Sequence, residues 1–68
     1  MRTFLDVLNL LKKYDIYIHV GNRLWDIELA AIEIDNMYKA GLLEAKEYAQ
    51  IKLVLRHEHE DEERRQAL

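Results

Sequence analysis

The longest helical pattern in the chain lies in residues 22–41, which read NRLWDIELAAIEIDNMYKAG. Asn22 is a favoured N-cap residue, and Gly41 is the glycine expected just after a helix C-terminus. One apolar stripe along this helix comprises Leu24, Ile27, Ala31, Ile34 and Tyr38. A second stripe, on nearly the opposite side, comprises Trp25, Leu29 and Ile32. A helix that is apolar on two faces usually lies between neighbours, which here means both other helices, or one helix and a second copy of the protein.

Two further helical patterns flank this one. The first begins at Thr3, which with Asp6 resembles a capping box, and Asp15 is its expected end. The buried face of the first helix comprises Phe4, Val7, Leu8, Leu11 and Tyr14. The third helix begins near Glu44, and its core face comprises Ala45, Tyr48, Ile51 and Leu55. The sequence therefore predicts an all-α fold, a compact three-helix bundle.

The segment between the first two helices, residues 16–20, alternates β-branched and other residues in the manner of a strand. The chain offers no second strand to pair with it. We therefore interpret it as an extended connector whose isoleucines, Ile16 and Ile18, plug the core. The alternative is a free edge that pairs with another chain by strand addition.

With 68 residues the chain has room for one domain, and half of its residues are apolar, which is enough for a packed core. The chain has no cysteine, no signal-peptide pattern and no apolar run of membrane-spanning length, which predicts a cytoplasmic protein that does not enter a membrane. Residues 1–56 carry balanced charge and form the predicted three-helix domain. Residues 57–68 hold the excess negative charge and form a predicted charged helix extension or frayed tail.

The sequence contains no pattern that is typical of an active site or of a metal site. The chain has no serine or cysteine, one threonine that already serves as a cap, and no glycine-rich phosphate loop, so we expect neither an enzyme nor a small-molecule substrate. His57 and Asp61 lie one helical turn apart, but two ligands on an exposed helix make a weak metal site. We therefore expect no metal and no cofactor.

The remaining candidates are binding surfaces. Aromatic and basic residues occur together around the end of the first helix, the connector and the start of the second helix, at Lys12, Lys13, Tyr17, His19, Arg23 and Trp25. Single-stranded nucleic acid is bound by such a mixture, because bases stack on rings and phosphates meet cations. The alternative is a core tryptophan with ordinary helix-end lysines. The stripe of Trp25, Leu29 and Ile32 also fits contact with another protein or with a second copy.

The order of these features resembles the YqgQ family of small bacterial proteins over roughly residues 3–60. The resemblance is carried by residues 10–14 (LLKKY), the Ile/Tyr-rich connector, Gly21-Asn22-Arg23, residues 38–43 (YKAGLL), Tyr48 and residues 53–56 (LVLR). It implies a three-helix fold in the cytoplasm of Gram-positive bacteria. It supplies no established activity, although single-stranded nucleic-acid binding has been suggested for proteins of this kind.

Overall fold

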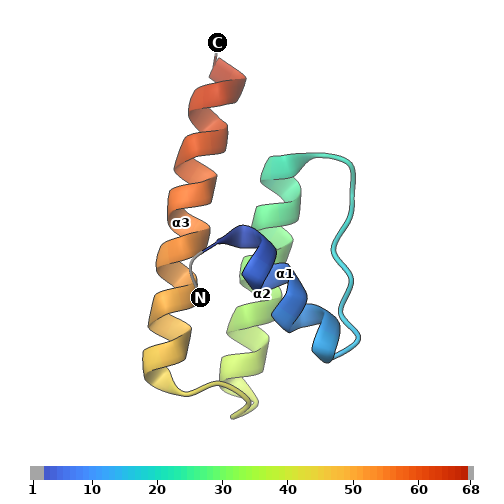
Figure 1. Cartoon of the computed structure of the whole chain (residues 1–68), viewed down its shortest axis with the longest axis vertical. Coiled ribbons are helices and arrows are strands. Elements are labelled where there is room, and N and C mark those ends of the chain that lie inside the picture. The colour runs from blue at the N-terminus through green and yellow to red at the C-terminus, as the bar shows by residue number, and fades with distance from the viewer. Residues whose placement is uncertain (1–2, 68) are drawn as a thin grey trace.

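Two long helices, α2 (Arg23–Lys39) and α3 (Ala45–Ala67), run antiparallel to each other, and the shorter α1 (Phe4–Lys13) packs against both of them (Figure 1). The computed structural model describes residues 3–67. It confirms the all-α three-helix bundle predicted from the sequence, with a connector of nine residues between α1 and α2. The predicted domain of residues 1–56 and the predicted tail of residues 57–68 include residues 1, 2 and 68, which lie outside the described residues.

The starts of α1 and α2 are fixed by side-chain caps. The amide of Asp6 donates to the hydroxyl of Thr3, and the amide of Thr3 donates to the carboxylate of Asp6, each over 3.2 Å. The side chain of Asn22 accepts from the amide of Trp25 over 3.2 Å. These bonds satisfy amide groups that have no partner inside the first helical turn, so the two predicted N-caps are confirmed.

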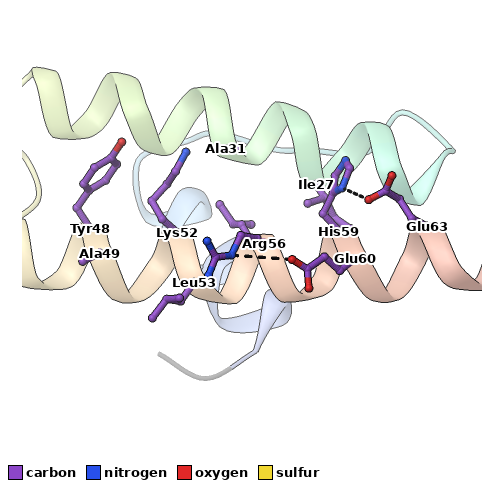
Figure 2. Close-up of a pocket in the computed structure, with 11 residues that line it drawn as sticks. Ile27, Ala31, Tyr48, Ala49, Lys52, Leu53, Arg56, His59, Glu60 and Glu63 are labelled. Atoms are coloured by element: carbon purple, nitrogen blue, oxygen red, sulfur yellow. Dashed lines mark hydrogen bonds and ion pairs between the residues drawn. The ribbon is translucent and has the colours of Figure 1, made fainter.

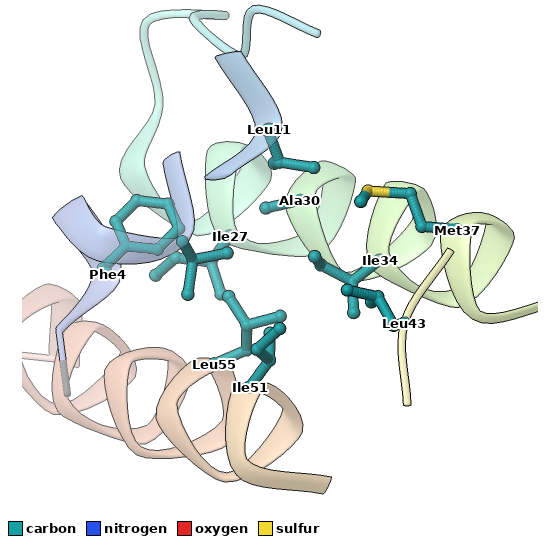
Figure 3. Packing of buried hydrophobic residues seen from close by; sticks show 10 residues of the cluster. Phe4, Leu11, Ile27, Ala30, Ile34, Met37, Leu43, Ile51 and Leu55 are labelled. Atoms are coloured by element: carbon teal, nitrogen blue, oxygen red, sulfur yellow. The ribbon is translucent and has the colours of Figure 1, made fainter. Parts of the chain in front are cut away.

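The core lies where the three helices meet (Figure 3). Its buried residues are Phe4, Val7, Leu11, Ile27, Ala30, Ile34, Met37, Leu43, Ile51 and Leu55. The buried face of α2 differs from the predicted stripe, because Ala30 and Met37 are buried while Tyr38 is 39% exposed. The reason is that α2 is covered by α1 as well as by α3, which turns its buried face toward α1.

The connector is extended, but it forms no β-strand, and no other segment between residues 3 and 67 forms one. Ile16 and Ile18 are partly buried against the core, which confirms that the connector's isoleucines plug it. Val20 is 48% exposed, and its amide donates to the carboxylate of Asp26 over 2.8 Å. This bond holds the end of the connector against the first turn of α2. Whether the connector edge pairs with another chain stays a prediction.

The last part of α3 extends beyond the start of α2 (Figure 1). Residues 57–67 are helical throughout, and ion pairs one turn apart join Arg64 to Asp61 and Arg65 to Glu62. Such pairs stabilise an exposed stretch of helix by about 0.2–0.5 kcal/mol each. Between residues 3 and 67 there is no helix with the length and apolar character needed to cross a membrane.

Candidate interaction surface

An apolar stripe lies on the face of α2 that points away from the core. It consists of Trp25, Leu29 and Ile32, which are 61%, 38% and 53% exposed, and we call it the outer stripe. Their spacing of four and three residues places them on one side of the helix, opposite the buried Ile27 and Ile34. Neither α1 nor α3 covers this side of α2. The second apolar face seen in the sequence is therefore free in the single chain.

The candidate residues for nucleic-acid binding do not form one patch. Lys12 and Lys13 are exposed in the last turn of α1, whereas Arg23 and Trp25 lie in the first turn of α2. These two places are far apart, because the connector runs along the length of α2 from the end of α1 to the start of α2 (Figure 1). Tyr17 lies within the connector and is 70% exposed. Both candidate rings are thus exposed, but the two lysines are remote from Trp25.

Arg23 is already engaged within the chain. Its guanidinium lies over the ring of Phe4, 4.6 Å from the ring centroid, and 3.5 Å from the carboxylate of Glu58. The cation therefore links the start of α1, the start of α2 and the middle of α3. A phosphate would have to compete with Glu58 for this charge.

The end of the molecule that carries Trp25 is acidic. His59 of α3 contacts the carboxylate of Glu28 through Nε2 over 3.2 Å and that of Glu63 through Nδ1 over 3.0 Å. The hydrogen bond to Glu28, aided by Glu63, raises the pKa of His59 above its ordinary value despite partial burial. These contacts place the start of α2 beside residues 58–63, five of whose six side chains are acidic. Phosphates approaching Trp25 would therefore meet negative charge.

A groove of about 750 Å³ lies between α2 and α3 (Figure 2). Its apolar lining is made by Ile27, Ala31, Ala49, Leu53 and Leu55, and its polar lining by Tyr48, Lys52, Arg56, His59, Glu60 and Glu63. The groove exists because short side chains, Ala31 and Ala49, face it from both helices. Sequence reasoning missed it, although the alanines were a visible signal.

Asp35 and Tyr48 join the two helices at one end of this groove. The hydroxyl of Tyr48 donates to Asp35 over 2.6 Å, and Lys52 Nζ donates to the same carboxylate oxygen over 3.0 Å. The bond from Tyr48, followed by that from Lys52, lowers the pKa of Asp35. The ring of Tyr48 also stacks on Tyr38 with centroids 4.1 Å apart. These groups satisfy one another, so we assign them to holding the helix pair together.

The histidines do not form a metal centre within the described chain. No group of three or more histidine, cysteine, aspartate or glutamate side chains between residues 3 and 67 is arranged to hold an ion. His59, and not His57, is the histidine that contacts carboxylates, and it does so through its two different nitrogens. Opposite nitrogens of one ring cannot direct both carboxylates to a common ion.

Comparison with known proteins gives one consistent result. The family model described as YqgQ-like matches residues 1–61. A protein of Bacillus subtilis (strain 168), described as "Uncharacterized protein YqgQ", is 35% identical over 60 residues, which cover 88% of this chain and 84% of that protein. The residues matched by the family model include all of α1 and α2 and most of α3.

Proposed function

The chain belongs to the YqgQ-like family, and on that premise we propose that it is a non-enzymatic module that binds another protein through the outer stripe of α2. The observation that carries the proposal is the exposure of Trp25, Leu29 and Ile32 side by side on one helix face. Tryptophan is enriched among the residues that dominate binding energies, most of all where aliphatic neighbours exclude water around it.

The distribution of polar groups supports a binding role over a catalytic one. None of the buried residues between 3 and 67 is polar or charged. Two of the interacting pairs, Asp35 with Tyr48 and His59 with Glu28, are part-buried or exposed, and the members of each pair satisfy each other. Catalysis relies on preorganised polar groups in a site that excludes water, and these pairs lack such surroundings.

Single-stranded nucleic-acid binding is the second candidate, favoured by the exposure of Tyr17 and Trp25. Lys12 and Lys13 would meet phosphates while the rings stack on bases. The acidic segment beside Trp25 and the engagement of Arg23 with Glu58 weigh against it. Fluorescence anisotropy with a labelled oligothymidylate tests this candidate. Binding that weakens steeply with salt and with Tyr17→Ala would support it, whereas no binding at low salt would remove it.

Site-specific photo-crosslinking in the native cells tests the protein-binding proposal. A benzophenone side chain placed at position 29 lies within the outer stripe, and the same group at position 5 is the control. Leu5 is also exposed, at 62%, but lies on α1. We expect protein adducts from position 29 and far fewer from position 5. A folded variant that gives no adduct from position 29 would contradict the proposal.

A further inference from the structure

We propose that the partner of the outer stripe is a second copy of this chain, whose α2 lies antiparallel to the first α2 and seats in the groove between α2 and α3. This inference rests on the proposed protein-binding function and names its partner. In such a pair each copy supplies one α2 and one groove, so the arrangement closes on itself under two-fold symmetry.

The helix pairing within one chain fixes what lies at each level of the groove. Glu28 lies beside His59 near one end, and Tyr38 lies beside Tyr48 near the other. Ile32, which is 53% exposed, stands close to the middle of α2. If the two-fold axis passes beside Ile32, Trp25 and Lys39 exchange levels between the copies, because each is seven residues from Ile32.

This register matches charges at the acidic end of the groove. Trp25 lies one turn before Glu28, so its level on α3 is that of Glu60 and Glu63, the acidic residues that line the groove. Glu60 lies 4.0 Å from Arg56 and Glu63 lies 3.0 Å from His59, and both carboxylates are more than half exposed, so each can accept a further cation. The partner's Lys39 arrives at this level. Lys39 is exposed and takes part in none of the ion pairs described between residues 3 and 67. Two-fold symmetry forms the same contact twice.

The same register covers apolar surface at the opposite end. The partner's Trp25 arrives at the level of Lys39, next to the stacked rings of Tyr38 and Tyr48 and above Ala49. Tyr38 is 39% exposed, so an aromatic neighbour would bury ring surface that is now in water. Lys52 and Arg56, between the two ends, are paired with Asp35 and Glu60. Because Glu60 also lies at the level of the partner's Lys39, Arg56 and that lysine share this carboxylate, while Lys52 stays paired with Asp35 near the partner's Ile32.

The groove is needed to give the contact sufficient area. A stable complex buries about 800 Å² on each partner, which three side chains of the outer stripe alone do not supply. Seating a whole helix over two others adds the groove lining to the contact. Each end of the expected dimer then combines an aromatic contact with a charged one, and the partner's Ile32 lies between the two ends.

Charge reversal followed by sedimentation equilibrium of the purified chain tests the register. Lys39→Glu, and separately the pair Glu60→Lys with Glu63→Lys, should each weaken the dimer about three- to tenfold, because an exposed ion pair is lost twice. Combining the three substitutions should restore most of the affinity. Lys46→Glu, which reverses a lysine in the first turn of α3, is the matched control and should leave dimerisation unchanged. A dimer that is indifferent to these reversals would overturn the proposed register.

A cysteine at the symmetry axis provides an independent test. The chain has no cysteine, so Ile32→Cys introduces a single thiol. Under mild oxidation this variant should form a disulfide-linked dimer, whereas Gln50→Cys, exposed on the other side of α3 from the groove, should stay mostly monomeric. Equal cross-linking of the two variants would count against the arrangement.

The mass of the photo-adducts from position 29 separates this inference from the function on which it rests. Adducts of twice the chain mass, together with a dimer in sedimentation, would support both. Adducts with other proteins only, and a purified chain that stays monomeric into the millimolar range, would overturn the second-copy inference and leave the protein-binding function standing. Absence of adducts would contradict the function itself.

Discussion

Asp15 occupies after α1 the position that Gly41 occupies after α2. Both residues have positive φ, 60° for Asp15 and 79° for Gly41. After α1, the amides of Asp15 and Ile16 donate to the carbonyls of Lys12 and Leu11, each over 3.0 Å. After α2, the amides of Gly41 and Leu42 donate to the carbonyls of Tyr38 and Met37, also over 3.0 Å. The two helices thus end in the same hydrogen-bonded motif, which favours glycine at this position.

A glycine introduced at position 15 should stabilise the fold, whereas replacing the glycine at position 41 should destabilise it. Asp15→Gly should stabilise the fold by about 0.5–1 kcal/mol, because it relieves a left-handed backbone and removes a negative charge from a helix C-terminus. Gly41→Ala should destabilise it by about 1 kcal/mol through backbone strain alone, since an added Cβ meets no atom within 4 Å. Urea denaturation measures both, and a stabilising Gly41→Ala would contradict this account of the motif.

Two isoleucines two residues apart on α2 should respond differently to truncation. Ile34→Ala should cost about 2–5 kcal/mol, because Ile34 is fully buried. Ile32→Ala should change the stability of the monomer by less than about 0.5 kcal/mol, because Ile32 is exposed and belongs to the outer stripe. Thermal unfolding at low protein concentration, where association does not contribute, is the measurement. A large loss for Ile32→Ala would mean that the outer stripe supports the fold of the single chain.

The parts of the fold that were predictable from sequence are those that depend on neighbours along the chain. The caps at Thr3 and Asn22 and the glycine after α2 follow from backbone geometry within a few residues. The predicted buried face of α2 was partly wrong, because hydrophobic periodicity does not show on which side of α2 the first helix packs. The engagement of Arg23 with Phe4 and Glu58 could not be predicted, since it joins three helices from distant parts of the chain. The exposure of Trp25 could not be predicted either, because the sequence shows two apolar faces on this helix and does not indicate which of them is buried.

Removing the hydroxyl of Tyr48 should be felt at Asp35. Tyr48→Phe keeps the ring that stacks on Tyr38 but deletes the hydrogen bond that contributes most to lowering the pKa of Asp35. The pKa of Asp35 should therefore rise toward its ordinary value. A group with a lowered pKa stabilises the fold above its unfolded pKa and loses that contribution as pH falls through its folded pKa. The stability difference between the wild-type chain and the variant should therefore be full near neutral pH and shrink on acidification. NMR titration of the Asp35 carboxyl measures the shift, and Tyr38→Phe, which keeps the hydroxyl of Tyr48, is the control.

Stability near neutral pH should depend on His59. Its pKa is raised, chiefly by the hydrogen bond to Glu28 and also by Glu63, so the folded state binds a proton more tightly than the unfolded chain does. The resulting stabilisation is complete below the unfolded pKa of about 6.5 and is lost as pH rises through the folded pKa. The difference in urea midpoint between the wild-type chain and His59→Gln should therefore be larger at pH 5.5 than at pH 8.5. His57→Gln is the matched control, because no hydrogen bond or ion pair described between residues 3 and 67 involves His57. If the two glutamine variants behaved alike across this range, the contacts of His59 would not stabilise the end of the groove that we assign to the partner's Lys39.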